Sequence, residues 1–175
     1  GKTLVSILLY STMFIPATAL TYPVYNLINN LNLYDTRGAL ILIYSCSGIA
    51  ISFFVIKNYY DNIPRDLEEA ARIDGCGYVR TWVKVIFPIA RPGIMTAAVL
   101  AFLNNWNEYY WASLVLITRE KLTVPSLLST FTTAFNTNYN GLFSAMVVII
   151  LPPILLYCIF SKFFIEALSG GAVKG

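Results

Sequence analysis

Residues Gly38 to Ile56 read GALILIYSCSGIAISFFVI, a run without a single charged side chain. A helix needs about twenty mostly apolar residues to cross the hydrocarbon layer of a membrane, and this run has about that length. Three other runs have the same character, namely Leu4–Leu20, Gly93–Ile117 and Leu142–Ile165. The sequence therefore predicts four membrane-spanning helices within one domain that covers residues 1–175.

The composition of the whole chain is also typical of a membrane protein. Hydrophobic residues make up 57% of the 175 residues and charged residues only 12%, with a mean hydropathy of +0.65. A soluble domain carries about twice that charged fraction. We therefore expect an all-α fold, a polytopic bundle of transmembrane helices. Because the chain starts at Gly1 rather than Met and enters its first apolar run at once, we expect this bundle to be truncated at its N-terminus.

Several functional classes find no support in the residues. The chain has no histidine and its three cysteines lie far apart, so we expect no metal site. The net charge of +3 comes from scattered cations, which argues against a nucleic-acid partner. Gly1-Lys2-Thr3 matches the end of a phosphate-binding loop but lacks the earlier glycine and the α/β domain that such a loop needs. We expect no catalytic residue, no bound cofactor and no enzymatic activity in this chain.

Lysine and arginine predict the orientation in the membrane, since cytoplasmic loops near the spans collect positive charge. With four spans, one side holds nine of these residues and the other side holds three, which are Arg37, Arg119 and Lys121. We therefore place both termini and the loop from Lys57 to Arg91 in the cytoplasm, and the connections 22–37 and 118–141 outside.

The cytoplasmic loop between Lys57 and Pro92 reads as two short helices around the turn Gly75-Cys76-Gly77. Pro64 suits the first position of the first helix, and acidic residues follow it where the helix dipole favours anions. Apolar residues recur at helical spacing in the second helix until Pro88, which we expect to end it. Such an amphipathic pair can lie along the membrane surface or insert into a groove of a partner.

One motif in this loop resembles the EAA loop of ABC importer permeases, whose pattern is E-A-A-x3-G-x9-I-x-L-P. The chain departs from it only at Val85 and Phe87, which replace Ile and Leu. The residues that match this pattern are Glu69, Ala70, Ala71, Gly75 and Pro88, and Asp74 fits the commoner form of the motif. The resemblance implies that a coupling loop at about residues 57–92 docks on a separate ATPase subunit, which binds ATP with Mg. A surface hairpin without a partner is the alternative.

Two further elements and the C-terminus resemble the carbohydrate-uptake branch of this family. They are Trp106-Asn107-Glu108-Tyr109, the stretch 123–127 (TVPSL) and the final residues 171–175 (GAVKG). Members of the branch usually have six spans, so about two are expected upstream of Gly1. The resemblance implies a multi-pass subunit of the bacterial cytoplasmic (inner) membrane that translocates a sugar. Its implied partners are the ATP-binding subunit, a second permease subunit, an extracytoplasmic solute-binding protein and membrane lipid.

A polar cluster in the predicted span Gly93–Ile117 is the candidate solute path. Asn104, Asn107 and Glu108 lie at helical spacing and alternate with Trp and Tyr residues. Ionisable groups within a membrane are functional candidates, and aromatic faces beside amides suit the C–H faces and hydroxyl edges of a sugar. The alternative is an aromatic belt at the membrane interface. Import of an amino acid, peptide or polyamine, secondary transport and a membrane scaffold are the competing functions.

Overall fold

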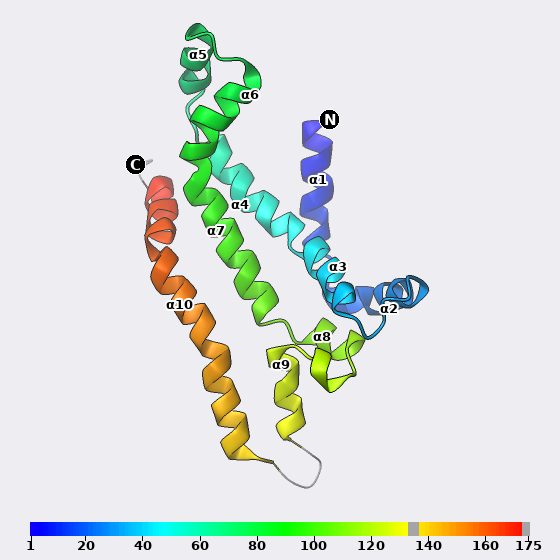
Figure 1. Ribbon diagram of the computed structural model, residues 1–175. Coiled ribbons are helices and arrows are strands. Elements are labelled where there is room, and N and C mark those ends of the chain that lie inside the picture. Colours follow the sequence, from blue (N-terminus) through cyan, green and yellow to red (C-terminus); the bar gives the residue numbers. More distant parts are fainter. Residues whose placement is uncertain (133–136, 173–175) are drawn as a thin grey trace. The chain divides into compact units, whose positions relative to one another are not determined.

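The computed structural model describes residues 1–132 and 137–172, and the regular elements in this part of the chain are helices (Figure 1). The all-α prediction is therefore confirmed. The chain forms two compact units. The first unit comprises Gly1–Ala50 and Phe102–Tyr157, and the second comprises Ile51–Ala101 and Cys158–Gly175.

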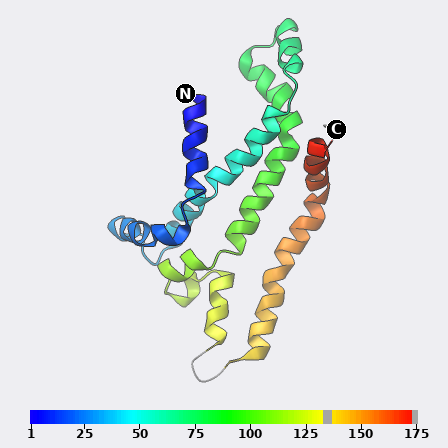
Figure 2. The same cartoon turned by 180° about the vertical axis from the view of Figure 1, so that it is seen from behind.

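Among the described residues, three continuous helices are long and apolar enough to cross a membrane. The helix Arg37–Asp61 consists of α3 (Arg37–Ser47) and α4 (Ile49–Asp61). The helix Tyr78–Trp106 consists of α6 (Tyr78–Thr81), a π-helical turn (Trp82–Ile86) and α7 (Phe87–Trp106). The helix Tyr139–Ser161 belongs to α10 (Tyr139–Ala172), the long helix that both ribbon views follow from end to end (Figure 2). The predicted span Gly38–Ile56 falls within the first of these, and most of Leu142–Ile165 falls within the third.

The first predicted span, Leu4–Leu20, is not one straight helix. Helix α1 ends at Thr12, and a second helical stretch runs from Ala17 to Asn30 at an angle of 92° to it. This stretch contains a 3-10 turn (Ala17–Leu20) and α2 (Thr21–Asn30). Pro16 lies in the break with an extended backbone (ψ 137°), and its missing N–H and its ring prevent the helix from continuing. The bent pair counts as a fourth span only if both arms are taken together.

The third predicted span, Gly93–Ile117, was placed too far along the chain. The helix starts at Tyr78 and ends at Trp106, because Arg80, Lys84 and Arg91 do not interrupt it. Long cationic side chains can extend along a helix toward the headgroups while their carbon stems stay in apolar surroundings.

Pro88 does not end the second loop helix, as the sequence had led us to expect. It is the second residue of α7, and the helix runs through it. A proline ring clashes with the carbonyl four residues earlier, here that of Lys84, and Lys84 lies in the π-helical turn Trp82–Ile86. The wider turn relaxes the register at that point, so the loop helix and the span form one element.

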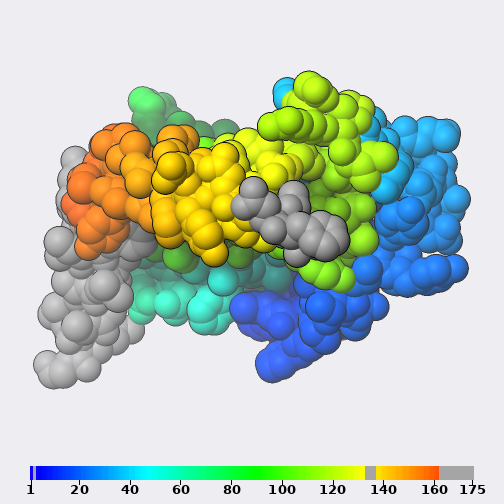
Figure 3. Space-filling model, turned by 90° about the horizontal axis from the view of Figure 1, so that it is seen from below, coloured from blue at the N-terminus to red at the C-terminus, as the bar shows by residue number. Residues whose placement is uncertain are grey.

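Helix α8 (Tyr110–Val115) packs against α3 and forms the core of the first unit. The space-filling view shows the yellow-green segment that contains it pressed against the light blue segment around residues 25–40 (Figure 3). The buried residues of this core are Ile28, Ala39, Leu40, Ile43, Trp111, Ala112, Val115 and Leu116. Helix α8 is therefore anchored on the span that starts at Arg37.

The stretch that follows α8 forms short turns rather than one longer helix. It contains 3-10 turns at Arg119–Lys121 and Leu128–Phe131, with α9 (Val124–Leu127) between them. The Thr123 side chain caps α9 by accepting a hydrogen bond from the Ser126 N–H (3.4 Å). The stretch 123–127 thus contains one capped helical turn, and residues 133–136 lie outside the described part.

Candidate functional site

The motif Glu69-Ala70-Ala71 lies on α5 (Asp66–Ile73) in the second unit. This helix begins two residues later than the sequence predicted, because Arg65 rather than a residue before Pro64 is its N-cap. Asp66, Glu68 and Glu69 fall in its first turn, where carboxylates interact favourably with the helix dipole. Ala71 is buried at 6% exposure, whereas Glu69 and Ala70 face outward. The short alanine side chain lets α5 approach its neighbour, and the acidic face of α5 is exposed.

The end of α5 is a glycine-dependent cap. The N–H of Cys76 donates to the carbonyl of Ala71 (2.9 Å), and the N–H of Gly75 donates to that of Arg72 (3.0 Å). This pair of bonds defines a Schellman motif, in which the residue after the C-cap adopts a left-handed conformation. Asp74 is that C-cap, and Gly75 has a φ of +78°. The turn predicted at Gly75 is therefore present, and its backbone explains why glycine stands there.

The turn presents apolar side chains to its surroundings. Ile73 is 87% exposed and Val79 71%, on either side of the glycine turn. Exposed apolar groups beside an acidic helix face are what a docking element offers to a complementary cleft. Of the six predicted coupling residues, Glu69 and Ala70 are exposed and Ala71 is buried. Asp74 and Gly75 form the cap of α5, and Pro88 lies inside α7.

Glu108 in the first unit caps α8. Its carboxylate accepts hydrogen bonds from the backbone N–H groups of Trp111 (2.7 Å) and Ala112 (3.1 Å) and from the hydroxyl of Tyr44 (2.7 Å). An anion at a helix N-terminus satisfies orphan N–H groups and interacts favourably with the dipole. Tyr44 lies on α3, 64 residues away in sequence, and no local pattern indicated this partner. Glu108 therefore fixes the break between α7 and α8 and its link to α3.

Asn104 and Asn107 lie at the end of a span and not in its middle. Asn104 is in the last turn of α7 and exposed, and Asn107 follows Trp106, the last residue of the helix. The Asn107 amide donates to the carbonyl of Leu103 (2.9 Å), a bond within its own turn. Asn104 and Asn107 fall at the end of the helix Tyr78–Trp106 because this helix draws its length from the residues before Gly93. Both amides remain accessible to a solute at this end of the helix.

A cavity of about 310 Å³ opens beside this cluster in the first unit. Asn105 and Trp106 line it together with Arg37, Lys121 and Thr123. The Trp106 indole N–H donates to the carbonyl of Ile149 on α10 (3.0 Å), which fixes the ring. An aromatic ring, an amide, a guanidinium and a hydroxyl around one cavity are groups that bind sugar hydroxyls.

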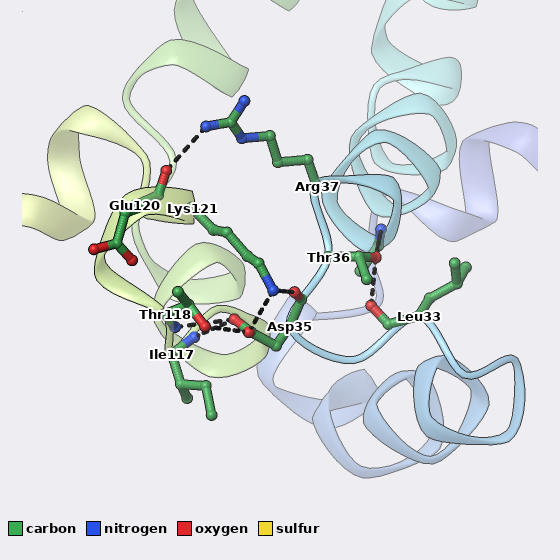
Figure 4. Close-up of polar contacts among 9 residues, drawn as sticks. Leu33, Asp35, Thr36, Arg37, Ile117, Thr118, Glu120 and Lys121 are labelled. Atoms are coloured by element: carbon green, nitrogen blue, oxygen red, sulfur yellow. Dashed lines mark hydrogen bonds and ion pairs between the residues drawn. The ribbon is translucent and has the colours of Figure 1, made fainter.

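Asp35 joins two connections of the first unit and was not singled out from the sequence (Figure 4). Its carboxylate accepts from the N–H groups of Ile117 (2.9 Å) and Thr118 (3.0 Å), from the Thr118 hydroxyl, and from the Lys121 ammonium (2.7 Å). The bond to Lys121, followed by those to Thr118 and Ile117, holds the pKa of Asp35 far below its usual range. Nearby, Arg37 donates to the carbonyl of Glu120 (3.0 Å). We call these contacts the Asp35 clasp.

The described residues bring no three His, Cys, Asp or Glu side chains together as a metal site. The free cysteines Cys46, Cys76 and Cys158 lie on separate segments, and the first and last of these are exposed. The predicted terminal motif 171–175 falls largely outside the described residues.

Comparison with known proteins extends over nearly the whole chain. Residues 1–169 match the family of binding-protein-dependent transport system inner membrane components. The arabinooligosaccharides transport system permease protein of Bacillus subtilis is 33% identical over 175 residues, which are 100% of this chain and 62% of that protein. The trehalose transport system permease protein of Mycobacterium tuberculosis is 33% identical over 176 residues, covering 99% of this chain and 64% of that protein.

A solved structure has the same architecture. A bacterial ABC transporter involved in the import of the acidic polysaccharide alginate contains a chain with a TM-score of 0.73 and 26% identity, covering 94% of this chain and 62% of that one. This chain therefore spans about three fifths of the length of these relatives. Its helices, its apolar spans and its match over residues 1–169 lead to one conclusion: the chain belongs to the binding-protein-dependent transport system inner membrane components, multi-pass proteins of the cytoplasmic membrane.

Proposed function

We propose that the chain is part of the permease subunit of an ATP-driven importer that moves a sugar into a bacterial cell. The observation that carries this is the similarity, over 99–100% of the chain, to permeases named for arabinooligosaccharides and trehalose. Another relative, from Agrobacterium fabrum, is named for sulfoquinovosyl glycerol and is 31% identical. The solutes in these names all carry sugar units, which favours a sugar over an amino acid, peptide or polyamine.

The hairpin of α5 and α6 is the proposed docking element for a separate ATPase subunit. Its support is the outward acidic face at Glu69, the rigid Schellman turn at Gly75 and the exposed Ile73 beside it. ATP with Mg is bound and hydrolysed on that partner in this proposal. A second permease subunit and an extracytoplasmic solute-binding protein complete the complex.

Asn104 and Asn107 are the proposed solute contacts, with Glu108 in a positioning role. Both amides are exposed at the end of α7, and the Glu108 carboxylate is already engaged by three donors. The adjacent cavity, with Asn105 and Trp106 on its wall, offers a binding volume next to them. A sugar hydroxyl can exchange hydrogen bonds with such amides while a ring face rests on the indole.

Solute-stimulated ATP hydrolysis tests the proposed function. The full-length permease is purified with its ATPase, its second permease and its solute-binding protein, and reconstituted in vesicles. We expect arabinooligosaccharides or other sugars to raise the hydrolysis rate, and amino acids, peptides and polyamines to leave it unchanged. Stimulation by an amino acid, peptide or polyamine alone would assign the complex to another solute class. Uptake driven by an ion gradient without ATP would show a secondary transporter.

A further inference from the structure

The cavity beside Asn105 and Trp106 carries a positive charge that no carboxylate on its wall balances. Its volume of about 310 Å³ is close to the lower limit of about 300 Å³ for ligand cavities, so it suits a single sugar unit. Arg37 and Lys121 are the cations on its wall, and no Asp or Glu is among the described residues that line it. The Lys121 ammonium is neutralised by the carboxylate of Asp35 (2.7 Å). The unbalanced charge is therefore that of Arg37.

The Arg37 guanidinium is held in place but keeps donors for a ligand. One of its N–H groups donates to the backbone carbonyl of Glu120 (3.0 Å), and the Glu120 carboxylate points away from it (Figure 4). Arg37 belongs to neither of the two ion pairs that the described part of the chain contains. A guanidinium has five N–H donors and can form two parallel bonds to one carboxylate. Arg37 is therefore placed to bind an anionic group.

The position of Arg37 on its helix adds to the positive charge. Arg37 is the first residue of α3, directly after the N-cap Thr36, and the first turn of α3 contains no acidic residue. The N-terminus of a helix carries a partial positive charge, so a cation there is unfavourable and an anion is favourable. Leu40, in the same turn, also lines the cavity, which therefore lies against this end of α3. An anion bound in the cavity offsets the charges of the helix end and of Arg37 together.

The remainder of the wall suits the ring of a sugar. The Trp106 indole is fixed by its N–H bond to the Ile149 carbonyl (3.0 Å) and by stacking on Phe102, with ring centroids 5.5 Å apart. A fixed aromatic ring offers an apolar surface to the C–H face of a sugar without losing side-chain freedom on binding. The half-buried Asn105 amide can both donate to and accept from a hydroxyl. The wall thus combines a site for a sugar ring with a site for one negative charge.

We propose that this cavity binds a uronate unit, that is, a sugar ring that carries a carboxylate. The inference rests on the proposed function and narrows the solute from a sugar to an acidic oligosaccharide. The carboxylate pairs with Arg37 at the N-terminus of α3, while the ring lies against Trp106 and one hydroxyl bonds to Asn105. A neutral sugar fills the same space but leaves the guanidinium without its partner. Arg37 is then the residue that determines specificity.

Ligand protection of a cysteine on the cavity wall tests the proposal. Val124 lines the cavity and is exposed, so Val124→Cys is introduced in a background without Cys46, Cys76 and Cys158. The full-length permease is assembled with its second permease and its ATPase, and the solute-binding protein is left out so that its own selectivity does not enter. The rate of labelling by a water-soluble thiol reagent is measured against the concentration of digalacturonate, of its neutral dimethyl ester and of galactobiose.

The three sugars have the same rings and differ in the carboxylates. We expect digalacturonate to halve the labelling rate at a concentration at least about tenfold lower than the ester or galactobiose, the factor expected for a hydrogen bond between charged groups. Arg37→Gln should raise this concentration for digalacturonate to that of the ester. It should leave the value for the ester unchanged, which shows that the cavity is still intact. Arg119→Gln removes an exposed cation of the same connection that is not on the cavity wall, so it should change none of the values.

Four results would overturn the proposal. Equal protection by the three sugars would remove the preference for an acid, and protection by none of them would show that the cavity holds no sugar. A preference for digalacturonate that survives in Arg37→Gln would belong to another residue. Protection by sodium phosphate at the same concentration as by digalacturonate would show a general anion site.

The proposed function is tested separately by solute-stimulated ATP hydrolysis of the complex with its solute-binding protein. If sugars stimulate hydrolysis but the three sugars protect the cysteine equally, only the preference for a uronate fails and sugar import stands. If only an amino acid, peptide or polyamine stimulates hydrolysis, sugar import fails and the inference falls with it.

Discussion

At the residue scale, Gly75 and Gly77 lie two positions apart in the same turn and differ in the sign of their backbone angle φ. Gly75 has a φ of +78°, whereas Gly77 has a φ of −70°, and in both cases an added Cβ would meet no atom within 4 Å. Space is therefore not limiting at either position. Only Gly75 occupies the left-handed region, which costs other residues about 1–2 kcal/mol.

We therefore expect Gly75→Leu to distort the hairpin and Gly77→Leu to be tolerated. In the purified complex, Gly75→Leu should lower sugar-stimulated ATP hydrolysis while the permease stays in the membrane at normal level. Gly77→Leu adds the same side chain and serves as the control. Unimpaired uptake by Gly75→Leu would count against a coupling role for this turn.

Glu108 provides the second residue-scale prediction. Replacing it by Ala leaves two backbone N–H groups of α8 and the Tyr44 hydroxyl without their acceptor. Hydrogen bonds to a charged group contribute about 1.5–3 kcal/mol, so Glu108→Ala should lower the melting temperature of the complex clearly. Tyr44→Phe removes one of the three donors and should have a smaller effect.

The control for this change is Glu120→Ala, which removes an exposed carboxylate from the same connection. It should leave the melting temperature unchanged. If Glu108→Ala is as stable as Glu120→Ala but abolishes sugar stimulation, then Glu108 contacts the solute directly and the positioning role is wrong.

Gly75, Glu108 and Asp35 show which residue-level features could be predicted from the sequence. The spacing of Gly75 within the motif predicted a turn, because a Schellman cap is a local structure. The partners of Glu108 and Asp35 lie 64 and more than 80 residues away and could not be found by local periodicity. The sequence therefore did not indicate that Glu108 caps α8, and Asp35 was overlooked.

At the element scale, α4 and α7 approach each other closely at Gly93 in the second unit. A Cβ on Gly93 would lie 2.5 Å from Cγ of Tyr59 and 2.7 Å from its Cβ, near the root of that side chain. Rotation of the ring cannot relieve such a contact. Gly93→Ala should therefore force the helices apart at a cost of about 1–3 kcal/mol, the usual range for overpacking.

Thermal unfolding of the complex measures this cost, with Gly48→Ala as the control. At Gly48 an added Cβ meets only the Tyr44 carbonyl at 3.7 Å, an ordinary contact. A Gly93→Ala complex that also carries Tyr59→Ala should regain part of the loss, because the two changes are coupled. Equal melting temperatures for Gly93→Ala and Gly48→Ala would refute the close approach.

The Asp35 clasp connects the segment before α3 with the segment after α8. Because the folded-state pKa of Asp35 is lowered, its contribution to stability is present above its unfolded pKa of about 3.9 and is lost as the pH falls below that value. Asp35→Asn should therefore melt at a lower temperature than the unchanged complex at pH 7.

The difference between the two melting temperatures should stay constant from neutral pH down to about pH 5 and shrink below about pH 4. A pH series of melting curves measures it, with Lys121→Met as a second variant that removes the cation. A difference that changes between pH 6 and 7 would show that another group is responsible.

The sequence predicted the membrane-spanning helices correctly where the length of an uncharged apolar run is enough to define the helix. The spans that contain Gly38–Ile56 and most of Leu142–Ile165 were predicted correctly for this reason. The third span was misplaced because a prediction from apolar length ends a span at charged residues and prolines. In the structure the helix continues through Lys84, in the π-helical turn, and through Pro88. The run Leu4–Leu20 was predicted as one span, whereas the chain bends by 92° at the break that contains Pro16.

At the scale of the whole molecule, each unit carries one candidate site. The first unit holds the amides at the end of α7, and the second holds the hairpin with its glycine turn. Much of α10 is apolar and exposed, including Ile150, Leu155 and Ile159, as expected for a surface covered by lipid or by other subunits. The functional predictions are therefore tested in the proposed complex with the partner subunits.

The solute path is the prediction that requires this whole complex. Asn104 and Asn107 are exposed at the end of α7, and each can exchange hydrogen bonds with sugar hydroxyls. Asn104→Leu and Asn107→Leu should each lower sugar-stimulated ATP hydrolysis at least about tenfold, the loss expected for one hydrogen bond of about 1.4 kcal/mol, while the complex still assembles. If these residues form an interfacial belt instead, both variants will transport normally, and Trp106 and Trp111 will matter for membrane insertion.

Access of a water-soluble thiol reagent separates the two arrangements. Asn104→Cys is placed in a background without Cys46, Cys76 and Cys158, and its labelling rate is measured with and without sugar and ATP. A residue on the path is shielded when the solute is bound and changes its exposure when ATP drives the transport cycle, so the rate should change under both conditions. Fast labelling that neither sugar nor ATP alters would place Asn104 on the open outer surface and exclude it from the path.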